Sequence, residues 1–169
     1  MSATDEVEAS PLEQLAGASG RDFPNLVQAR NVTRIGLEKR RAALARLPHD
    51  DDVAVVLMGS WGRAEVTAES DDDFMVLVRG TDREDVLPSI DDGKKVLDRA
   101  PGDQGIFGNP VGSDRLIGEI GLEEDTKSNL SRRMLLLLES VAATHEHVHE
   151  VVTGDLVDRY LDESVKDFR

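Results

Sequence analysis

Two apolar runs, Val53–Met58 and Phe74–Val78, stand out in the pattern of hydrophobic and polar positions along the chain. Both are short and rich in Val and Leu, as buried strands are. The polar connection between them is short for a parallel crossover, which needs about a dozen residues and usually a helix. The sequence therefore predicts an antiparallel pair of strands, around which the rest of the chain is organised.

Segments rich in helix-forming residues flank these two strands. Residues 25–47 predict a long helix that ends before Pro48. Further helices are expected within 82–100, from Ser113 to a stop at Gly121, and from Ser128 or Asn129 to about Ala143. A short strand is expected within 104–111.

The helix predicted over 25–47 contains most of the basic residues of the first half of the chain. A charge-rich helix usually presents such residues to solvent, and we expect a solvated face here, with contact to phosphate as the alternative. The basic residues are Arg30, Arg34, Lys39, Arg40, Arg41 and Arg46.

The C-terminal part carries two apolar features. Met134–Leu138 would be apolar on nearly every side of a helix, which predicts central burial. We expect Arg132 and Arg133, which precede this run, to form structural ion pairs, with contact to a bound phosphate as the alternative. After Gly154 an amphipathic stripe predicts packing in a homodimer or against a further domain. The stripe comprises Leu156, Val157, Tyr160, Leu161 and Phe168.

The candidate chemistry lies between the two strands. Gly59-Ser60 follows the first strand, where glycine permits close approach to a ligand and nearby backbone N–H groups favour phosphate oxygens. Asp71 and Asp73 precede the second strand and point the same way, because successive side chains of an extended chain alternate, while Asp72 points opposite. Two carboxylates on one face can hold Mg²⁺. The alternative is a solvated hairpin loop, but adjacent acids repel unless a cation neutralises them.

These residues also carry a resemblance to a known family. Gly59-Ser60-x-Gly62-Arg63-x-Glu65, followed by Ser70-Asp71-x-Asp73 and an apolar strand, resembles the signature of the DNA polymerase β-type nucleotidyltransferase superfamily. It is similar to the version in the glutamine-synthetase adenylyltransferases, the nitrogen-regulatory uridylyltransferases and bacterial proteins that share their catalytic domain. The resemblance implies an α+β nucleotidyltransferase fold, with a small mixed sheet, flanking helices and a C-terminal helical segment.

The resemblance further implies transfer of a nucleoside monophosphate from an NTP to an acceptor, with Mg²⁺ or Mn²⁺ as cofactor. Asp71 and Asp73 would be the catalytic residues and the metal ligands. Gly59, Ser60 and Arg63 would bind the nucleotide, since a hydroxyl, backbone N–H groups and a planar guanidinium suit phosphate oxygens. Glu65 would orient Arg63 or serve as an outer acid. Trp61 would cover the strand ends, with stacking on a base as the alternative.

One part of the family pattern is missing from the sequence. Family members with full activity carry a third carboxylate on a later strand, between apolar residues. Asp98, Asp103 and Asp114 are candidates by position, yet none has apolar neighbours on both sides. The rival hypothesis is therefore a catalytically inactive nucleotide-binding or protein-interaction module on the same fold.

The composition of the chain limits the classes of molecule that it is expected to bind. The 169 residues contain 20 Lys and Arg and 34 Asp and Glu, for a net charge of −14, so the average field repels nucleic acid. We expect a protein or small-molecule acceptor instead. The chain contains no Cys, no signal peptide and no apolar run of membrane-spanning length, which favours a cytoplasmic protein without a membrane partner.

The sequence predicts three regions. Residues 1–20 form an acidic, disordered leader, in which Pro11–Leu15 could form one helical turn. Residues 21–122 form the nucleotidyltransferase core, and residues 123–169 form C-terminal helices.

A histidine motif gives a second rival hypothesis. His145 and His149 are expected to share a helix face, as the ligands of a metalloprotease would, although the polar residues around them indicate a surface helix.

Overall fold

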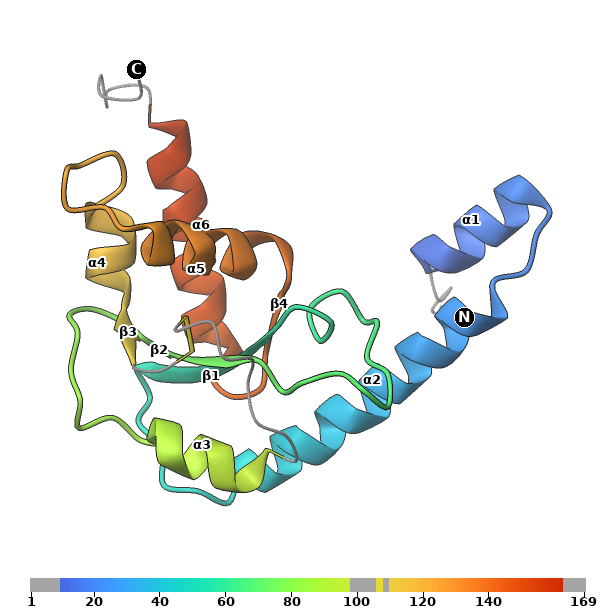
Figure 1. The fold of residues 1–169 in the computed structure, drawn as a ribbon, viewed down its shortest axis with the longest axis horizontal. Coiled ribbons are helices and arrows are strands. Elements are labelled where there is room, and N and C mark those ends of the chain that lie inside the picture. The colour runs from blue at the N-terminus through green and yellow to red at the C-terminus, as the bar shows by residue number, and fades with distance from the viewer. Residues whose placement is uncertain (1–9, 98–105, 108–109, 163–169) are drawn as a thin grey trace, which may run out of the picture.

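The computed structural model describes residues 10–97, 106–107 and 110–162, and it arranges them as a small sheet with helices on both sides (Figure 1). The elements in chain order are α1 (Pro11–Ser19), α2 (Pro24–Leu44), β1 (Val53–Met58), β2 (Phe74–Val78), α3 (Ile90–Val96), β3 (Val111–Gly112), α4 (Ser113–Gly118), α5 (Lys127–Leu138), β4 (Ser140–Ala142) and α6 (Glu146–Leu161).

The sheet has four strands in the order β3-β2-β1-β4. Strand β1 pairs antiparallel with β2, in a register that sets Val53 opposite Val78 and Leu57 opposite Phe74. It also pairs antiparallel with β4, whereas β2 pairs parallel with β3. The predicted bounds and antiparallel pairing of the two central strands are confirmed, as is a mixed α and β class with a small mixed sheet.

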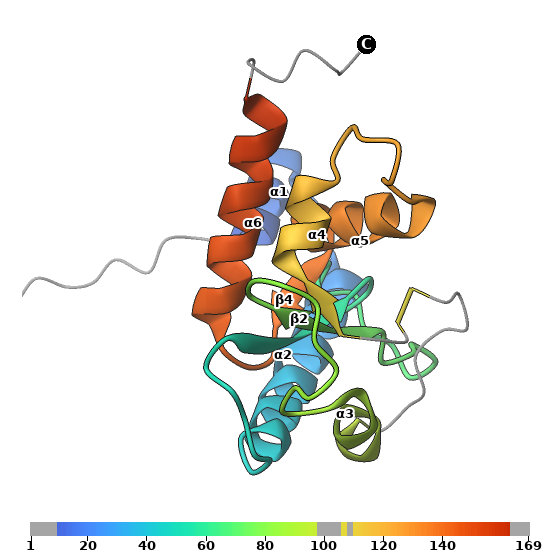
Figure 2. The ribbon, with the colours of Figure 1, turned by 90° about the vertical axis from the view of Figure 1, so that its left-hand side faces the viewer.

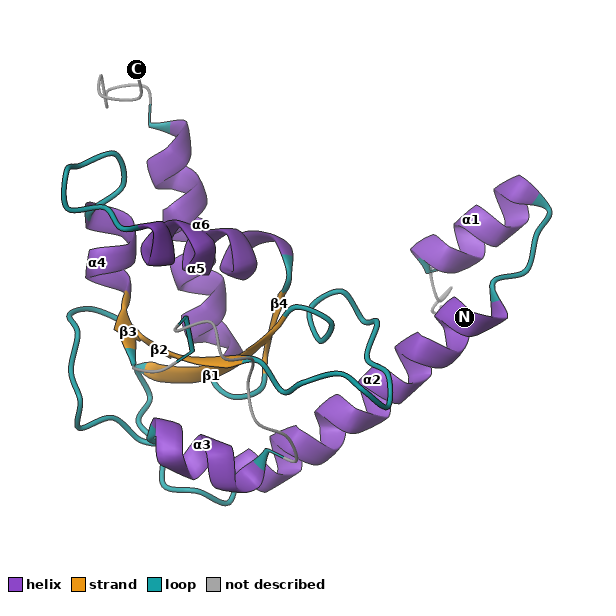
Figure 3. Ribbon diagram, in the orientation of Figure 1, coloured by secondary structure: helices purple, strands orange, loops and turns teal. Residues whose placement is uncertain are grey.

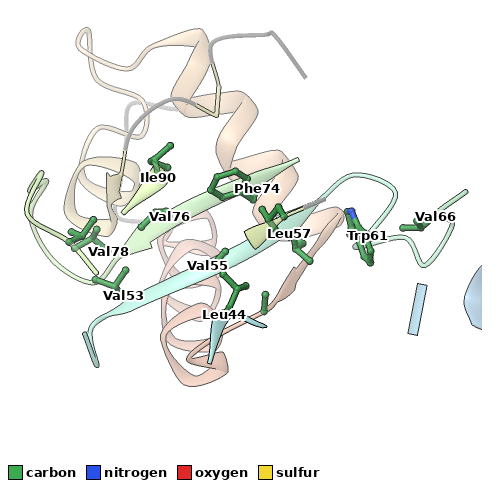
Figure 4. Close-up of a cluster of buried hydrophobic side chains, with 13 residues drawn as sticks. Leu44, Val53, Val55, Leu57, Trp61, Val66, Phe74, Val76, Val78 and Ile90 are labelled. Carbon is green, nitrogen blue, oxygen red and sulfur yellow. The ribbon is translucent and has the colours of Figure 1, made fainter. Parts of the chain in front are cut away.

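Helices cover both faces of the sheet, so the central strands are apolar at every position. On one face α2 and α3 cover a cluster that includes Val55, Val76 and Leu44 (Figure 4). On the other face α4, α5 and α6 cover a cluster that includes Val56, Leu77 and Leu116. Figures 2 and 3 show these two helical layers with the sheet between them.

The chain after α5 differs from the prediction. The helix begins after the N-cap Thr126 and ends at Leu138, and residues 140–142 form β4 at the edge of β1. The expected central burial of Met134–Leu138 is wrong in part, because Met134 is 37% exposed and Leu138 is 72% exposed, while Leu136 is buried. The helix therefore ends earlier than predicted, and residues 140–142 pair with the backbone of β1 instead of continuing it.

Charged side chains on two helices also have partners inside the protein. Arg40 is buried in an ion pair with Asp72, and Arg41 donates to the Ala142 carbonyl oxygen at 2.8 Å, so the expected solvated face is wrong for these two residues. Arg133 pairs with Asp125 at 2.6 Å and Arg132 donates to the Ile106 carbonyl oxygen at 3.0 Å. The expected structural ion pair is confirmed for Arg133, whereas the interactions of Arg132 with the described residues are hydrogen bonds.

The N-terminal segment is more ordered than the sequence suggested. Instead of one turn, the helix α1 spans Pro11–Ser19, where Ser10 and Glu13 form a capping box and Gly20 ends the helix with φ 63°. Residues 1–9 of the predicted leader lie outside the described residues. Nowhere in the described part of the chain does a helix combine the length and apolar character needed to cross a membrane.

The C-terminal stripe divides into a buried and an exposed part. Leu156 is fully buried against the sheet, whereas Val157 is 43% and Leu161 is 71% exposed. Phe168 lies outside the described residues. Because a buried leucine contributes through transfer from water and through packing, the two leucines should respond differently to truncation.

We therefore expect Leu156→Ala to lower the free energy of unfolding by about 2–5 kcal/mol. The matched control Leu161→Ala should change it by less than about 0.5 kcal/mol, as exposed positions do. Urea unfolding followed by circular dichroism measures both values. Equal losses for the two variants would contradict this division, as would a larger loss for Leu161→Ala than for Leu156→Ala.

Candidate functional site

One end of the sheet gathers residues from three strands. Strand β1 ends there, and β2 and β4 begin there, because Leu57 lies opposite Phe74 and Met58 lies opposite Ser140. The Met58 N–H donates to the Asp73 carbonyl oxygen at 2.9 Å, and the Gly59 N–H donates to the Glu139 carbonyl oxygen at 2.9 Å. The Gly-Ser turn and the acidic segment, predicted to act together, therefore meet at this edge.

Gly59 occupies a backbone position that favours glycine. Its φ is 62°, and a Cβ placed there would lie 3.7 Å from Asp73 Oδ2, so the Asp73 carboxylate stands beside the turn. The turn is closed by hydrogen bonds from the Arg63 N–H to the Gly59 carbonyl oxygen at 3.0 Å and from the Glu65 N–H to the Ser60 carbonyl oxygen at 2.8 Å. Ser60, the residue after Gly59 in this turn, is half-buried.

The three acids before β2 have different surroundings. Asp71 is exposed and Asp73 is half-buried, but Asp72 is fully buried. This matches the expected alternation, in which Asp72 points away from the other two. The Asp72 carboxylate accepts two hydrogen bonds from Arg40 Nη2, at 2.9 and 2.7 Å. The sequence indicated the direction of Asp72 but not its partner.

Trp61 joins the turn to these acids. Its indole Nε1 donates to Asp72 Oδ1 at 3.1 Å and to the Asp71 carbonyl oxygen at 3.3 Å, and the Arg40 guanidinium lies 4.2 Å from the ring centroid. Trp61 is only 3% exposed. The side chain is therefore buried beside the strand ends, as the covering role predicts, and it also lines the cavity described below.

Arg63 is held by two carboxylates. Its Nε donates to Glu65 at 2.9 Å, and its Nη1 forms an ion pair with Glu139, while the side chain stays 42% exposed. The hydrogen bond to Glu65, reinforced by the charge of Glu139, raises the pKa of the Arg63 guanidinium above its ordinary value. Glu65 was an expected partner of Arg63, whereas Glu139 was missed because it lies 76 residues away in the sequence.

The candidates for a third carboxylate do not join the pair within the described residues. Strand β3 runs parallel to β2 and sets Gly112 opposite Val78, so Asp114 follows the end of the sheet that lies opposite Asp73. Asp114 is therefore a wrong candidate. Asp98 and Asp103 lie outside the described residues. Among the described side chains, no group of three His, Cys, Asp or Glu residues is placed to hold a metal ion.

A cavity of about 620 Å³ lies between α2 and the segment from Trp61 to Asp72. Its walls are largely apolar, with Ala29, Val32 and Val66, and polar groups of Asn25 and Gln28 line it from α2. Asp72 lines this cavity, whereas Asp71 and Asp73 do not. The buried ion pair thus separates the cavity from the two acids predicted to hold a metal.

His145 and His149, predicted to share a helix face, have different surroundings in the structure. His145 precedes α6 with φ 43°, and its ring contacts that of His49 at a centroid distance of 5.2 Å. His149 lies within α6, where its Nε2 is 2.6 Å from Ser140 Oγ. The shared helix face expected for His145 and His149 is wrong, since His145 lies outside the helix in a left-handed conformation.

No protein-family model matches the sequence, and no curated protein matches it. The geometry of the described residues is therefore the basis for any functional assignment. That geometry consists of a Gly-Ser turn with the Asp73 carboxylate beside it, the exposed Asp71 in the same acidic segment, and an arginine held by carboxylates, all at one edge of the sheet.

Gly62 controls how closely this turn packs on β4. A Cβ at this position would lie 2.1 Å from the Glu139 carbonyl carbon and 2.3 Å from the Ser140 nitrogen, so backbone would have to move. We expect Gly62→Ala to destabilise the protein by about 1–3 kcal/mol, the usual cost of overpacking. The control Gly17→Ala, in α1 with nothing within 4 Å, should be neutral or stabilising in the same urea titration. No loss in Gly62→Ala would contradict the close packing.

The half-buried position of His149 predicts a pH dependence of stability. Burial lowers the pKa of His149, against the opposing charges of Glu146 and Glu150. The unfolded chain therefore binds a proton more readily, and stability present above about pH 6.5 is lost as the pH falls below that value. Between about pH 7.5 and 5.5, wild type should lose more unfolding free energy than His149→Gln. The control His147→Gln, at an exposed position, should retain the wild-type slope; equal slopes in all three proteins would contradict the prediction.

Proposed function

We propose that this protein is a metal-dependent nucleotidyltransferase, which transfers a nucleoside monophosphate from an NTP to an acceptor and releases pyrophosphate. The observation that carries the proposal is the position of the Asp73 carboxylate beside Gly59, with Asp71 exposed in the same segment. A turn that admits phosphate and carboxylates that attract a cation are the two parts that metal-bound triphosphate requires.

The donor set suits Mg²⁺ or Mn²⁺. Mg²⁺ prefers oxygen ligands, keeps several waters and is commonly bound by one or two carboxylates together with substrate phosphates. Asp71 and Asp73 would hold the ion, and the bound ion would neutralise charge on the triphosphate. Their carboxylates remain accessible, since Asp71 is exposed and Asp73 is half-buried.

Gly59, Ser60 and Arg63 would bind the nucleotide phosphates. Gly59 leaves space beside Asp73, and Ser60, the next residue of the turn, is half-buried. The guanidinium of Arg63 is fixed in direction by Glu65 and Glu139 and keeps an exposed edge. A triphosphate would compete with these two carboxylates for the guanidinium, so nucleotide binding and the Arg63 ion pairs would be coupled.

A second function is favoured by a specific observation. The described residues contain no third carboxylate beside Asp71 and Asp73, and activation of an acceptor hydroxyl needs a group that takes its proton. A module that binds nucleotide without turnover, or a protein-interaction module on the same fold, would need only the parts that are present. The two functions differ in turnover and share nucleotide binding.

The partners proposed for this protein follow from charge and from exposed apolar side chains. With a net charge of −14, a protein or small-molecule acceptor suits the protein better than a nucleic acid. A cytoplasmic setting would supply NTP and Mg²⁺. Exposed Val157 and Leu161 would provide a surface for a homodimer.

Nucleotide binding can be tested by thermal unfolding. Mg²⁺ with ATP, or with another NTP, should raise the melting temperature, because a ligand that binds only the folded state stabilises it, by about 2.7 kcal/mol at 100 times its Kd. Asp71→Asn with Asp73→Asn should remove the metal-dependent part. The control pair Asp155→Asn and Asp158→Asn changes the charge equally at exposed positions of α6 and should keep it. Equal shifts in all three proteins would contradict the assignment.

Turnover separates the enzyme from the binding module. Labelled ATP, UTP, CTP and GTP, each incubated with Mg²⁺ and cell extract, should yield a labelled acceptor and pyrophosphate if the protein is the proposed transferase. Wild-type protein that binds nucleotide but releases no pyrophosphate from any NTP would favour the module. The Asp71→Asn, Asp73→Asn variant serves as the negative control in this assay and should release no pyrophosphate.

A further inference from the structure

The ion pair between Arg40 and Asp72 is buried at the centre of the acidic segment. The Arg40 side chain is 9% exposed and that of Asp72 is 1% exposed. Removing two charges from water is costly, and apolar pairs of similar volume often stabilise a fold equally well. Stability alone therefore does not account for a buried charge pair beside two candidate metal ligands.

The position of Asp72 fixes the direction of its neighbours. In an extended segment the side chains of Asp71 and Asp73 point away from the side that Asp72 occupies. Arg40 holds both oxygens of the Asp72 carboxylate from α2, so the segment cannot rotate about its axis without breaking these bonds. The Met58 N–H holds the Asp73 carbonyl oxygen at 2.9 Å from the other side. The backbone that carries the two acids is thus held by α2 and by β1.

Trp61 extends this support to the phosphate turn. Its indole N–H is shared between Asp72 Oδ1 and the Asp71 carbonyl oxygen, and the ring packs on Gly36 of α2, where a Cβ would lie 2.9 Å from the ring. Trp61 belongs to the same turn as Gly59 and Ser60. One buried carboxylate therefore joins α2, the turn and the acidic segment.

The pair also changes the charge of the segment. Three adjacent carboxylates repel one another, and a positive charge against Asp72 cancels one of the three. Asp71 and Asp73 are then the carboxylates of the segment that a divalent cation would meet. A neutral side chain at position 72 would give the same net charge but would not hold the segment to α2.

We propose that Arg40 and Asp72 are positioning residues, which hold Asp71 and Asp73 in the arrangement that binds the metal ion. The inference rests on the proposed function, because it assumes a metal at these two acids. It adds two residues that are outside the proposed metal ligands and phosphate-binding residues and that contribute to the affinity of the site. Partners that orient metal ligands typically account for about 10- to 100-fold in metal affinity.

The test is a titration with Tb³⁺, an oxygen-preferring cation whose emission is excited by energy transfer from a nearby indole. Trp61 is the sole Trp of the chain and lies against the Asp71 backbone, so sensitised emission reports on binding at this segment. Titration midpoints give the affinity, and displacement by Mg²⁺ identifies the site as one that Mg²⁺ shares. Melting temperatures are recorded for every variant.

The decisive variant is Arg40→Met with Asp72→Leu, which replaces the ion pair by apolar side chains of similar size. We expect it to fold, with a melting temperature close to that of wild type, and to bind Tb³⁺ about 10- to 100-fold more weakly. Asp72→Asn, which keeps the shape and loses the charge, should show a weakening in the same direction, and Arg40→Lys should rescue part of the affinity. Arg34→Met removes a basic residue from the exposed side of the same helix and should bind as wild type does.

The outcomes distinguish the inference from the proposed function. A folded double variant with unchanged Tb³⁺ affinity would overturn the positioning role while leaving the metal site intact; if the double variant does not fold, the affinity of folded Asp72→Asn decides in its place. Wild-type protein without sensitised emission, or with emission that persists in Asp71→Asn, Asp73→Asn, would overturn the proposed function and the inference with it.

Discussion

The carboxylate of Asp72 is buried, and the surrounding structure is arranged to satisfy it. A buried anion is tolerated only with a cation and hydrogen-bond donors beside it. Arg40 supplies the charge and Trp61 supplies an N–H. To do so, α2 must cross this end of the sheet closely enough for Gly36 to contact the indole ring. The direction of the longest helix and the position of the turn are thus both tied to one acid.

Strand direction decides which residues gather at each end of the sheet. Antiparallel pairing of β1 with β2 and β4 places the exit of β1 beside the entrances of the other two strands. Gly59, Asp73 and Glu139 therefore meet, although they belong to distant parts of the chain. Parallel pairing of β2 with β3 carries Asp114 to the other end. The candidate site is a consequence of topology as much as of composition.

Arg63 shows how a charged group can be prepared for a ligand and also restrained by its own protein. Glu65 and Glu139 orient the guanidinium, and their charges weaken its attraction for other anions. A triphosphate carrying a metal ion has less net negative charge and is repelled less by these carboxylates. This fits a protein with a net charge of −14, in which a free polyanion would meet repulsion over most of the surface.

The local features of this protein could be predicted from its sequence. The apolar runs specified β1 and β2 to the residue, and the period of a strand indicated that Asp72 points away from Asp71 and Asp73. Such features depend on neighbours in the chain. The fold was needed to show that Arg40, 32 residues away, is the partner of Asp72, and that Glu139 meets Arg63. It also decided that residues 140–142 leave the predicted helix and pair with β1, because an unpaired strand edge and a buried charge are satisfied by groups that no local pattern identifies.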